Sequence, residues 1–204
     1  MTFPVLASLI ILTLVISISI KRQSRKRERA EREFWAREHR SNNVRRKSLD
    51  GLDYITIPLE TFPTHLLQED PVVLECIGIM ESLTSRKIVN FTGWSNTDLK
   101  LEYGTANITL LSEYDQNFTV LVRTLQKWAD VLIAAGHMDE AAVLMEYAVN
   151  IHTDISSTYY RLAEYWISQG DASRIPQLIQ TAESLRSSNG NVIVRHLKDS
   201  YPDF

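Results

Sequence analysis

The feature that most constrains the fold is a pattern of small and apolar residues that occurs in 122–155 and again, in the same order and spacing, in 156–189. Small residues let two helix backbones approach closely, and glycine can end a helix in a left-handed turn. The pattern therefore predicts two stacked helical hairpins. The matched pairs are Leu125 with Tyr159, Trp128 with Leu162, Ala129 with Ala163, Leu132 with Trp166, Gly136 with Gly170, Ala141 with Ile175, Met145 with Ile179, and Ala148 with Ala182.

This pattern resembles the tetratricopeptide repeat, whose unit has the same length. The resemblance implies an all-α fold in which a small α-solenoid is built from two repeats in residues 122–189. The second copy departs from the family pattern at Ile175, where alanine is expected, and at Pro176, which predicts a late or irregular start of its second helix. No proline closes either copy. The residues that carry the resemblance are Ala129, Gly136, Ala141, Ala148, Ala163, Gly170 and Ala182.

Two repeats leave an apolar face open at each end, so both ends require a cap. We expect residues 190–204 to form a capping helix at one end and residues 64–121 to form a helical cap region at the other. Within that region Asp70 is a good N-cap and Pro71 suits the first helical position. Residues 48–63 read as a linker followed by an extended arm that lies against the domain.

The segment from Phe3 to Ile20 contains no charged residue. As a helix it would span about 27 Å, enough for a thin bilayer. A cleaved signal peptide is the alternative, but such a peptide carries basic residues before the apolar run and a small-residue cleavage site after it. Because this chain has neither, residues 3–20 are predicted to be an uncleaved transmembrane helix.

The distribution of charged residues predicts the orientation of the chain in the membrane. Residues 21–47 hold 12 Lys and Arg against 4 Glu, whereas the rest of the chain is acidic. Basic residues next to a membrane span stay on the cytoplasmic side, so we expect the N-terminus outside and the C-terminal domain in the cytoplasm. The sequons at Asn90, Asn107 and Asn117 then carry no glycan. The single cysteine, Cys76, lies in an apolar run and is interpreted as an unreactive core thiol.

Residues 21–47 are rich in Arg, Glu and Ala and are predicted to form a basic juxtamembrane helix. Such clusters attract anionic lipid headgroups, although the same charge could serve only to set the topology. Nucleic-acid binding is not expected, because glutamates interrupt the run and an acidic domain follows it. The predicted lipid-contact residues are Lys21, Arg22, Arg25, Lys26, Arg27 and Trp35.

No catalytic motif or metal-ligand spacing occurs in the sequence, and no cofactor or metal is expected. In the tetratricopeptide family the first helix of each repeat lines a groove that holds a peptide. Here Gln126 and Asp130 depart from the residues that grip a peptide carboxylate in some members, so a carboxylate clamp in that groove is not expected. The residues implied as groove contacts are Arg123, Gln126, Lys127, Asp130, Ser157, Tyr160, Arg161 and Glu164.

The sequence therefore predicts a non-enzymatic, membrane-anchored adaptor that binds an unidentified protein partner in the cytoplasm. Two alternatives remain open. The chain could be a structural subunit held in a membrane complex mainly by its transmembrane helix, or the basic strip could bind anionic lipid.

Overall fold

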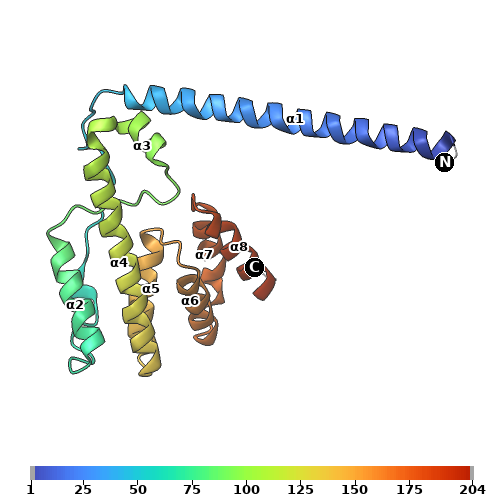
Figure 1. The fold of residues 1–204 in the computed structure, drawn as a ribbon. Helices are drawn as coiled ribbons and strands as arrows, with labels where there is room; N and C mark the ends of the chain where they lie inside the picture. The colour runs from blue at the N-terminus through green and yellow to red at the C-terminus, as the bar shows by residue number, and fades with distance from the viewer. Residues whose placement is uncertain (1–2, 203–204) are drawn as a thin grey trace. The chain divides into compact units, whose positions relative to one another are not determined.

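The computed structural model describes residues 3–202, without the side chains of residues 3–10, 14 and 15. Within this range the chain forms helices and no strand, which confirms the predicted all-α class (Figure 1). The α-helices are α1 (Phe3–Asn42), α2 (Pro71–Thr84), α3 (Asn96–Tyr103), α4 (Ile108–Ala134), α5 (Met138–Asn150), α6 (Ser156–Ser168), α7 (Ile175–Glu183) and α8 (Ser188–Ser200). Three single-turn 3-10 helices are η1 (Leu59–Thr61), η2 (Thr105–Asn107) and η3 (Ala172–Arg174).

Helix α1 is continuous from Phe3 to Asn42. Among the residues with described side chains, no helix holds an apolar stretch long enough to cross a membrane. Much of the predicted transmembrane segment, namely residues 3–10, 14 and 15, lies outside those residues. The transmembrane helix therefore stays a prediction.

The chain divides into two compact units. We call the first the stalk unit; it comprises the chain up to Lys47 together with Asn96–Ala106. The second, here the main unit, comprises Ser48–Ser95 and the chain from Asn107 onward. The chain thus passes between the units three times, and the short helix α3 belongs with α1 although more than fifty residues separate them.

In the stalk unit, α3 packs against the C-terminal end of α1 through polar side chains. The Glu38 carboxylate accepts hydrogen bonds from the ammonium of Lys100 and from Oγ1 of Thr97, the latter at 2.6 Å. Arg37 forms an ion pair with Asp98. The hydrogen bond from Lys100 and, to a smaller extent, that from Thr97 lower the pKa of Glu38 below its usual value.

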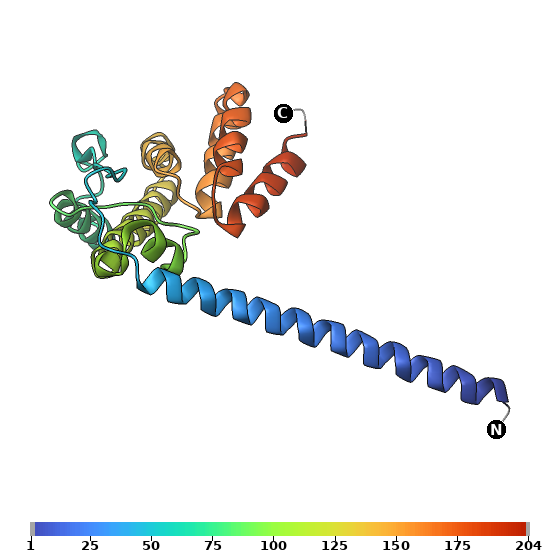
Figure 2. The same ribbon diagram turned by 90° about the horizontal axis from the view of Figure 1, so that it is seen from above.

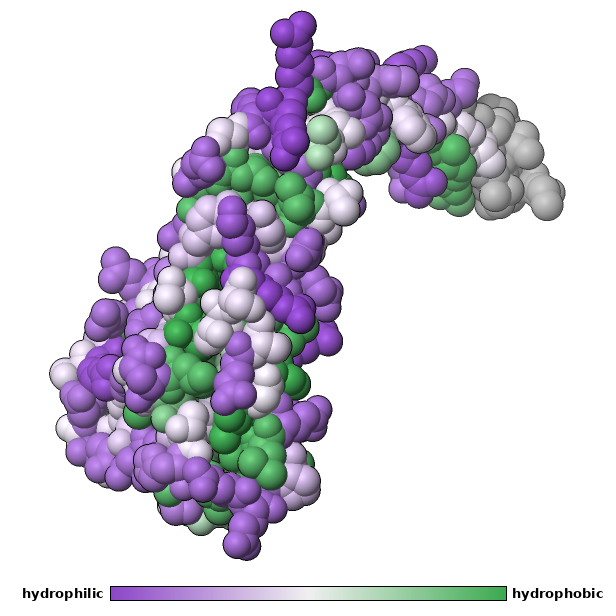
Figure 3. Space-filling view, turned by 90° about the vertical axis from the view of Figure 1, so that its left-hand side faces the viewer, coloured by the Kyte–Doolittle hydropathy of each residue, from purple (hydrophilic) through white to green (hydrophobic). Residues whose placement is uncertain are grey.

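In the main unit, helices α4 to α8 pack in succession, and α2 packs on the outer side of α4 (Figures 1 and 2). Their buried apolar side chains form one contiguous core, in which Trp128 of α4 and Tyr159 of α6 are the largest fully buried residues. Cys76 is buried in α2, as predicted, and its burial raises the pKa of the thiol. Figure 3 shows apolar residues among polar ones on the side of α2, where Leu74 is 52% exposed.

The arm before α2 packs against α4 and α5. The side chain of Phe62 lies edge-on to the rings of Trp128 and Tyr147, with centroid distances of 6.1 and 5.2 Å. The hydroxyl of Tyr147 donates a hydrogen bond to the Thr56 carbonyl at 2.9 Å, and burial raises the pKa of this tyrosine to about 12. Ile57 is also buried, so the arm is part of the core.

Three helices of the main unit end in the same way. Gly136 after α4, His152 after α5 and Gly170 after α6 have φ angles of 87°, 60° and 76°. At each end, the amide of the left-handed residue donates a hydrogen bond to the carbonyl three residues back. The amide of the next residue donates one to the carbonyl five residues back. These are Schellman ends, which satisfy the last helix carbonyls. The turns at Gly136 and Gly170, which occupy matched positions of the two predicted repeats, thus have equivalent hydrogen bonds.

Two local predictions from sequence are confirmed. Asp70 caps α2, because its Oδ1 accepts hydrogen bonds from the amides of Val72 and Val73 at 2.7 and 3.3 Å. The irregular start predicted from Pro176 is the 3-10 turn η3, which directly precedes α7.

Candidate binding site

The predicted groove residues of α4 face different neighbours. The Lys127 ammonium lies 2.7 Å from Oε2 of Glu75 on α2, and this contact raises the pKa of Lys127. Gln126 donates a hydrogen bond to Asp130 at 2.8 Å and accepts one from Thr158 of α6 at 2.6 Å. The side chains of Gln126 and Lys127 are thus engaged within the main unit, one toward α6 and one toward α2.

The predicted groove residues of α6 are also engaged. Arg161 pairs with Asp130 of α4 at 3.3 Å. The ring of Tyr160 lies against that of His196 on α8, with 3.9 Å between centroids. The pKa of Tyr201 is raised by burial and, to a smaller extent, by the negative charge of Glu164. The contacts of Arg161 and Tyr160 join helices to one another.

Three predicted groove residues make no side-chain hydrogen bond, ion pair or ring contact among the described residues. Arg123 of α4 and Glu164 of α6 are exposed, and Ser157 in the first turn of α6 is half-buried. The predicted groove therefore offers one unengaged arginine to a partner, whereas its lysine and its other arginine already bind carboxylates of the main unit.

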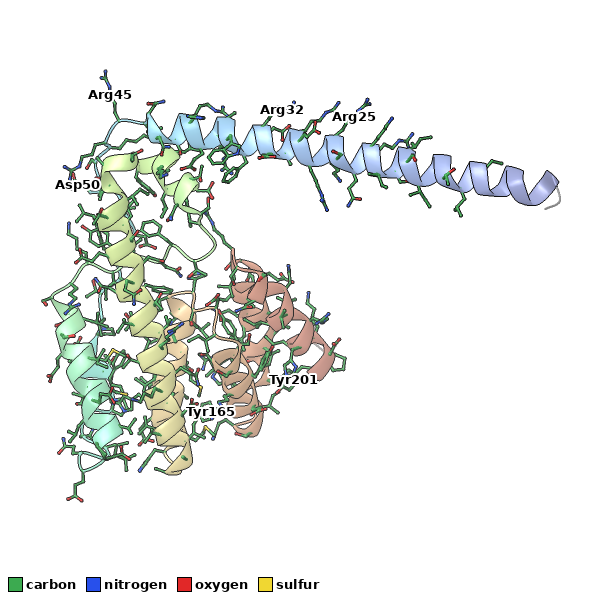
Figure 4. The ribbon with its side chains drawn as sticks, in the orientation of Figure 1. Arg25, Arg32, Arg45, Asp50, Tyr165 and Tyr201 are labelled. Carbon is green, nitrogen blue, oxygen red and sulfur yellow. The ribbon has the colours of Figure 1, made fainter. Side chains whose placement is uncertain are left out.

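The predicted lipid-contact residues all lie exposed on α1 (Figure 4, where Arg25 and Arg32 are labelled). Trp35 is 54% exposed and packs edge-on against Phe34, which is 57% exposed. Because α1 continues as one helix, Trp35 lies about 22 Å along the axis beyond Ile20. Trp35 therefore lies well beyond Lys21–Arg27 along α1.

A cavity with a volume of about 510 Å³ lies within the main unit. Its wall comes from four segments, namely residues 53–56 of the arm, the loop in 89–94, residues 150–152 at the end of α5, and residues 184–186 after α7. Two other cavities, of about 210 and 60 Å³, lie around Glu146 and Trp166. Only the first has the size of a typical ligand pocket.

Asn90 holds the loop against the end of α5. Its Nδ2 donates hydrogen bonds to the carbonyls of Ile151 and His152 at 3.1 and 3.0 Å, and its Oδ1 accepts the amide of Thr92 at 2.9 Å. His152 occupies the left-handed position there, an uncommon conformation for a residue other than glycine. The Asn90 side chain therefore satisfies two carbonyls at a helix end that faces the cavity.

Trp94 and Arg186 form the other side of the cavity. The guanidinium of Arg186 lies 4.6 Å from the centroid of the Trp94 ring, a cation–π geometry. The ring of Tyr54, which also lines the cavity, lies 5.0 Å from the ammonium of Lys87, a residue outside the cavity lining. The carboxylate of Asp53 also lines the cavity. The site thus contains aromatic rings, one exposed cation and one exposed anion.

The residues that line the cavity offer a ligand aromatic, charged and hydrogen-bonding side chains. The described residues contain no cluster of three or more His, Cys, Asp or Glu side chains suited to a metal ion. The smaller cavities surround a structural contact, in which Glu146 accepts hydrogen bonds from Trp166 Nε1 at 3.1 Å and from Arg174 at 2.7 Å.

Comparison of this chain with family models, with curated proteins and with solved structures finds no match.

Sequence reasoning missed the cavity residues. The sequence marks Asn90 only as a sequon, whereas its side chain binds carbonyls 61 and 62 residues away. The useful signal is local, since Gly93 and Trp94 follow Asn90 in a turn-rich loop. That signal predicts a loop with an aromatic residue, but not that Arg186 lies beside it.

Proposed function

We propose that this chain is a membrane-tethered, non-enzymatic adaptor whose main unit is a tetratricopeptide-like domain that binds a protein partner. The partner occupies the cavity between the arm and the ends of α5 and α7. The stalk unit connects this domain to the membrane and raises the local concentration of the partner there.

Two observations support a tetratricopeptide-like domain. The turns at Gly136 and Gly170 have the same left-handed geometry and equivalent hydrogen bonds, and they stand at matched positions of the two repeats. Each turn lies between two consecutive helices that pack within one stack, α4 with α5 and α6 with α7. The short α8 and the N-terminal α2 cover the two ends of this stack, as a two-repeat array requires.

The membrane tether is supported by the sequence of residues 3–20, which has no charged residue and is followed directly by Lys21 and Arg22. The burial of two of the three sequon asparagines in the main unit supports its placement in the cytoplasm. Asn107 is fully buried, and Asn117 is 5% exposed with its Nδ2 bonded to the Lys87 carbonyl at 3.0 Å. A glycan on either side chain would be incompatible with these packed positions, and this fits a domain that never meets the glycosylation machinery.

The observation that carries the proposed binding site is the 510 Å³ cavity, whose exposed side chains are available to a ligand. By contrast, Gln126, Lys127 and Arg161 of the predicted groove already hold helices together. A partner at the predicted groove would have to displace these contacts, whereas a partner at the cavity would not.

The test is partner capture from membranes with the full chain and a variant that fills the cavity. Ser184 lines the cavity and is exposed, so Ser184→Trp should block it. Ser168 is a matched control, because each serine is exposed and donates its hydroxyl to the carbonyl three residues back, at 2.6 Å for Ser184 and 2.7 Å for Ser168. We expect Ser184→Trp to abolish capture of the partner that the wild type retains, and Ser168→Trp to leave it unchanged.

The alternative outcomes separate the other functions. A triple variant with alanine at Arg123, Lys127 and Arg161 that loses the partner while remaining folded would move the site to the predicted groove. If partner capture requires the apolar segment 3–20 and is unchanged in every variant of the main unit, the chain is a structural subunit of a membrane complex instead.

A further inference from the structure

We infer that the cavity of the main unit binds an extended peptide segment, and that Arg186 binds a carboxylate of that peptide. This inference rests on the proposed function and names the chemistry of its binding site. Three properties of the cavity lead to it, namely the placement of Arg186, the backbone groups of the arm and the distribution of charge.

Arg186 is oriented for a carboxylate that the chain does not supply. Its side chain is exposed, and no Asp or Glu among the described residues lies within ion-pair distance of it. The guanidinium carbon lies 4.6 Å from the centroid of the Trp94 ring, a cation–π contact that limits where the head group can move. The N–H groups of this guanidinium are not paired with a carboxylate of the described residues, and an added carboxylate can bind two of them.

The backbone holds Trp94 and Arg186 together independently of their side chains. Gly93 has a φ angle of 82°, which favours glycine, and a Cβ built there would lie 2.7 Å from the Cβ of Arg186. The loop backbone therefore packs directly on the segment that follows α7. Arg186 needs little reorganisation to bind, which lowers the entropic cost of association.

The arm offers backbone groups suited to a peptide. The amide of Ile55 donates a hydrogen bond to the Ile88 carbonyl at 2.9 Å. Within the described residues the amide of Thr56 and the carbonyl of Tyr54 have no partner, and both residues line the cavity. Successive residues of an extended chain direct their backbone groups to opposite sides. On the side of Tyr54 and Thr56, the Thr56 carbonyl accepts the Tyr147 hydroxyl, and the Tyr54 carbonyl and the Thr56 amide are the groups left to pair with an added peptide.

The charges of the cavity restrict where the acidic group of the peptide can lie. Asp53 and the carbonyl end of α5 are negative, so they disfavour an anion near them. Among the described residues that line the cavity, Arg186 is the one lysine or arginine. The cavity thus fits a peptide with a single acidic group at the Arg186 end, and it disfavours a polyanion such as nucleic acid.

The experiment is a binding selection in which an array of short random peptides is probed with the full chain in detergent micelles. We expect the retained peptides to share an acidic group at one position. Arg186→Gln should weaken their binding about ten- to a hundredfold, the usual effect of losing a charged hydrogen-bonded pair. Arg186→Lys, which keeps the charge but loses the planar fork, should recover only part of it.

The matched control is Arg195→Gln, which removes an exposed arginine from α8 of the same unit. It should leave the affinity of the selected peptides unchanged, and all three variants should keep the wild-type circular dichroism spectrum and thermal midpoint. The inference would be overturned if the retained peptides lacked an acidic group, or if their affinity did not change with Arg186→Gln. A selection that retains no peptide would overturn it as well.

The carboxylate could come from an acidic side chain or from the C-terminus of the partner. Resynthesis of the selected peptides with a C-terminal amide distinguishes these sources, because only a terminal carboxylate is lost by amidation. If the partner captured from membranes is lost with Ser184→Trp but not with Arg186→Gln, the carboxylate inference fails and the proposed adaptor function stands. If no partner is lost with either variant, the proposed site fails too.

Discussion

The stalk unit and the main unit are stabilised by different kinds of contact. Helix α3 is held on α1 largely by polar side chains, in the half-buried ion pair of Glu38 with Lys100 and the more exposed ion pair of Arg37 with Asp98. The main unit has a continuous buried core around Trp128. An exposed ion pair contributes about 0–1 kcal/mol, whereas a fully buried large side chain contributes about 1.5–3 kcal/mol. Acid and salt should therefore separate α3 from α1 under conditions in which the main unit stays folded.

The largest expected effect is in the core of the main unit. Trp128 is fully buried, so Trp128→Ala should lower the free energy of unfolding by about 3–5 kcal/mol through lost contacts and a cavity. Because α1 does not depend on this core, part of the helical circular dichroism should persist after the main unit has unfolded. Urea denaturation followed by far-ultraviolet circular dichroism measures both quantities.

Trp35→Ala is the control, since Trp35 of α1 is 54% exposed. It should change the unfolding free energy of the main unit by less than about 0.5 kcal/mol. A single transition that removes all helical signal in the Trp128 variant would contradict the independence of the two units.

The second prediction compares substitutions of two glycines that both have a left-handed backbone conformation. Gly104 in the stalk unit has a φ angle of 89°, and a Cβ there would lie 2.3 Å from the Arg45 carbonyl oxygen. Gly170 in the main unit has a φ angle of 76° and open space around it. Gly104→Ala should therefore displace α3 from α1, whereas Gly170→Ala should cost only the left-handed strain, about 1–2 kcal/mol.

Hydrogen exchange resolved by segment measures this difference. We expect the amides of α3 to lose protection in Gly104→Ala, with no change in α4 to α6. In Gly170→Ala the loss should be confined to the main unit. Equal protection of α3 in the two variants would show that the contact between Gly104 and Arg45 does not position α3.

A smaller effect is the acid sensitivity of the contact between α1 and α3. The hydrogen bonds from Lys100 and Thr97 lower the pKa of Glu38 in the folded chain. Because the pKa of Glu38 is lowered, the ionised carboxylate stabilises the contact between α1 and α3 above the ordinary pKa of 4.5. This stabilisation is lost as the pH falls through the pKa of Glu38 in the folded chain. Exchange of the α3 amides should therefore accelerate in acid in the wild type.

Glu38→Gln removes this pH dependence. The variant should show weaker protection of α3 at neutral pH and little further change on acidification. Added salt should weaken the wild-type contact at neutral pH and affect the variant less. A wild-type contact that is insensitive to both acid and salt would mean that apolar burial, for example of Leu99, holds α3 in place.

The features that sequence predicted well depend on neighbours in the chain. The cap at Asp70 and the left-handed turns at Gly136 and Gly170 follow from one or two residue types in a fixed local order. The burial of Cys76 follows from the apolar run around it. Such rules hold because the contacts they describe span only a few residues.

The features that sequence did not predict are contacts between distant segments. The resemblance to the tetratricopeptide repeat implied that Lys127 of α4 faces a groove, but it did not show that Glu75 of α2 lies beside it. It also gave no sign that His152 takes a left-handed conformation or that Asn90 binds the helix end there. Each depends on how loops and helices meet in space, which a pattern within one segment does not contain.

The smallest expected effect concerns Asp115 of α4, which helps to hold the loop that forms the cavity. Its Oδ1 accepts the amide of Phe91 at 3.2 Å, and burial raises the pKa of the carboxyl in the folded chain. Because the pKa of Asp115 is raised, its contribution to the stability of the main unit is greatest below the ordinary pKa of 3.8. That contribution declines as the pH rises through the pKa of Asp115 in the folded chain. Asp115→Asn keeps an oxygen acceptor and has no charge to bury, so it should stabilise the main unit by about 0.5 kcal/mol at neutral pH.

This gain should disappear as the pH approaches 3.8, because the wild-type carboxyl is then protonated and uncharged as well. Thermal unfolding of the two chains over a series of pH values measures the difference. The same substitution at the exposed Asp53 is the control and should give no such pH-dependent gain. If Asp115→Asn instead destabilises the main unit at neutral pH, the charged hydrogen bond to the Phe91 amide supports the loop by more than the burial of the charge costs.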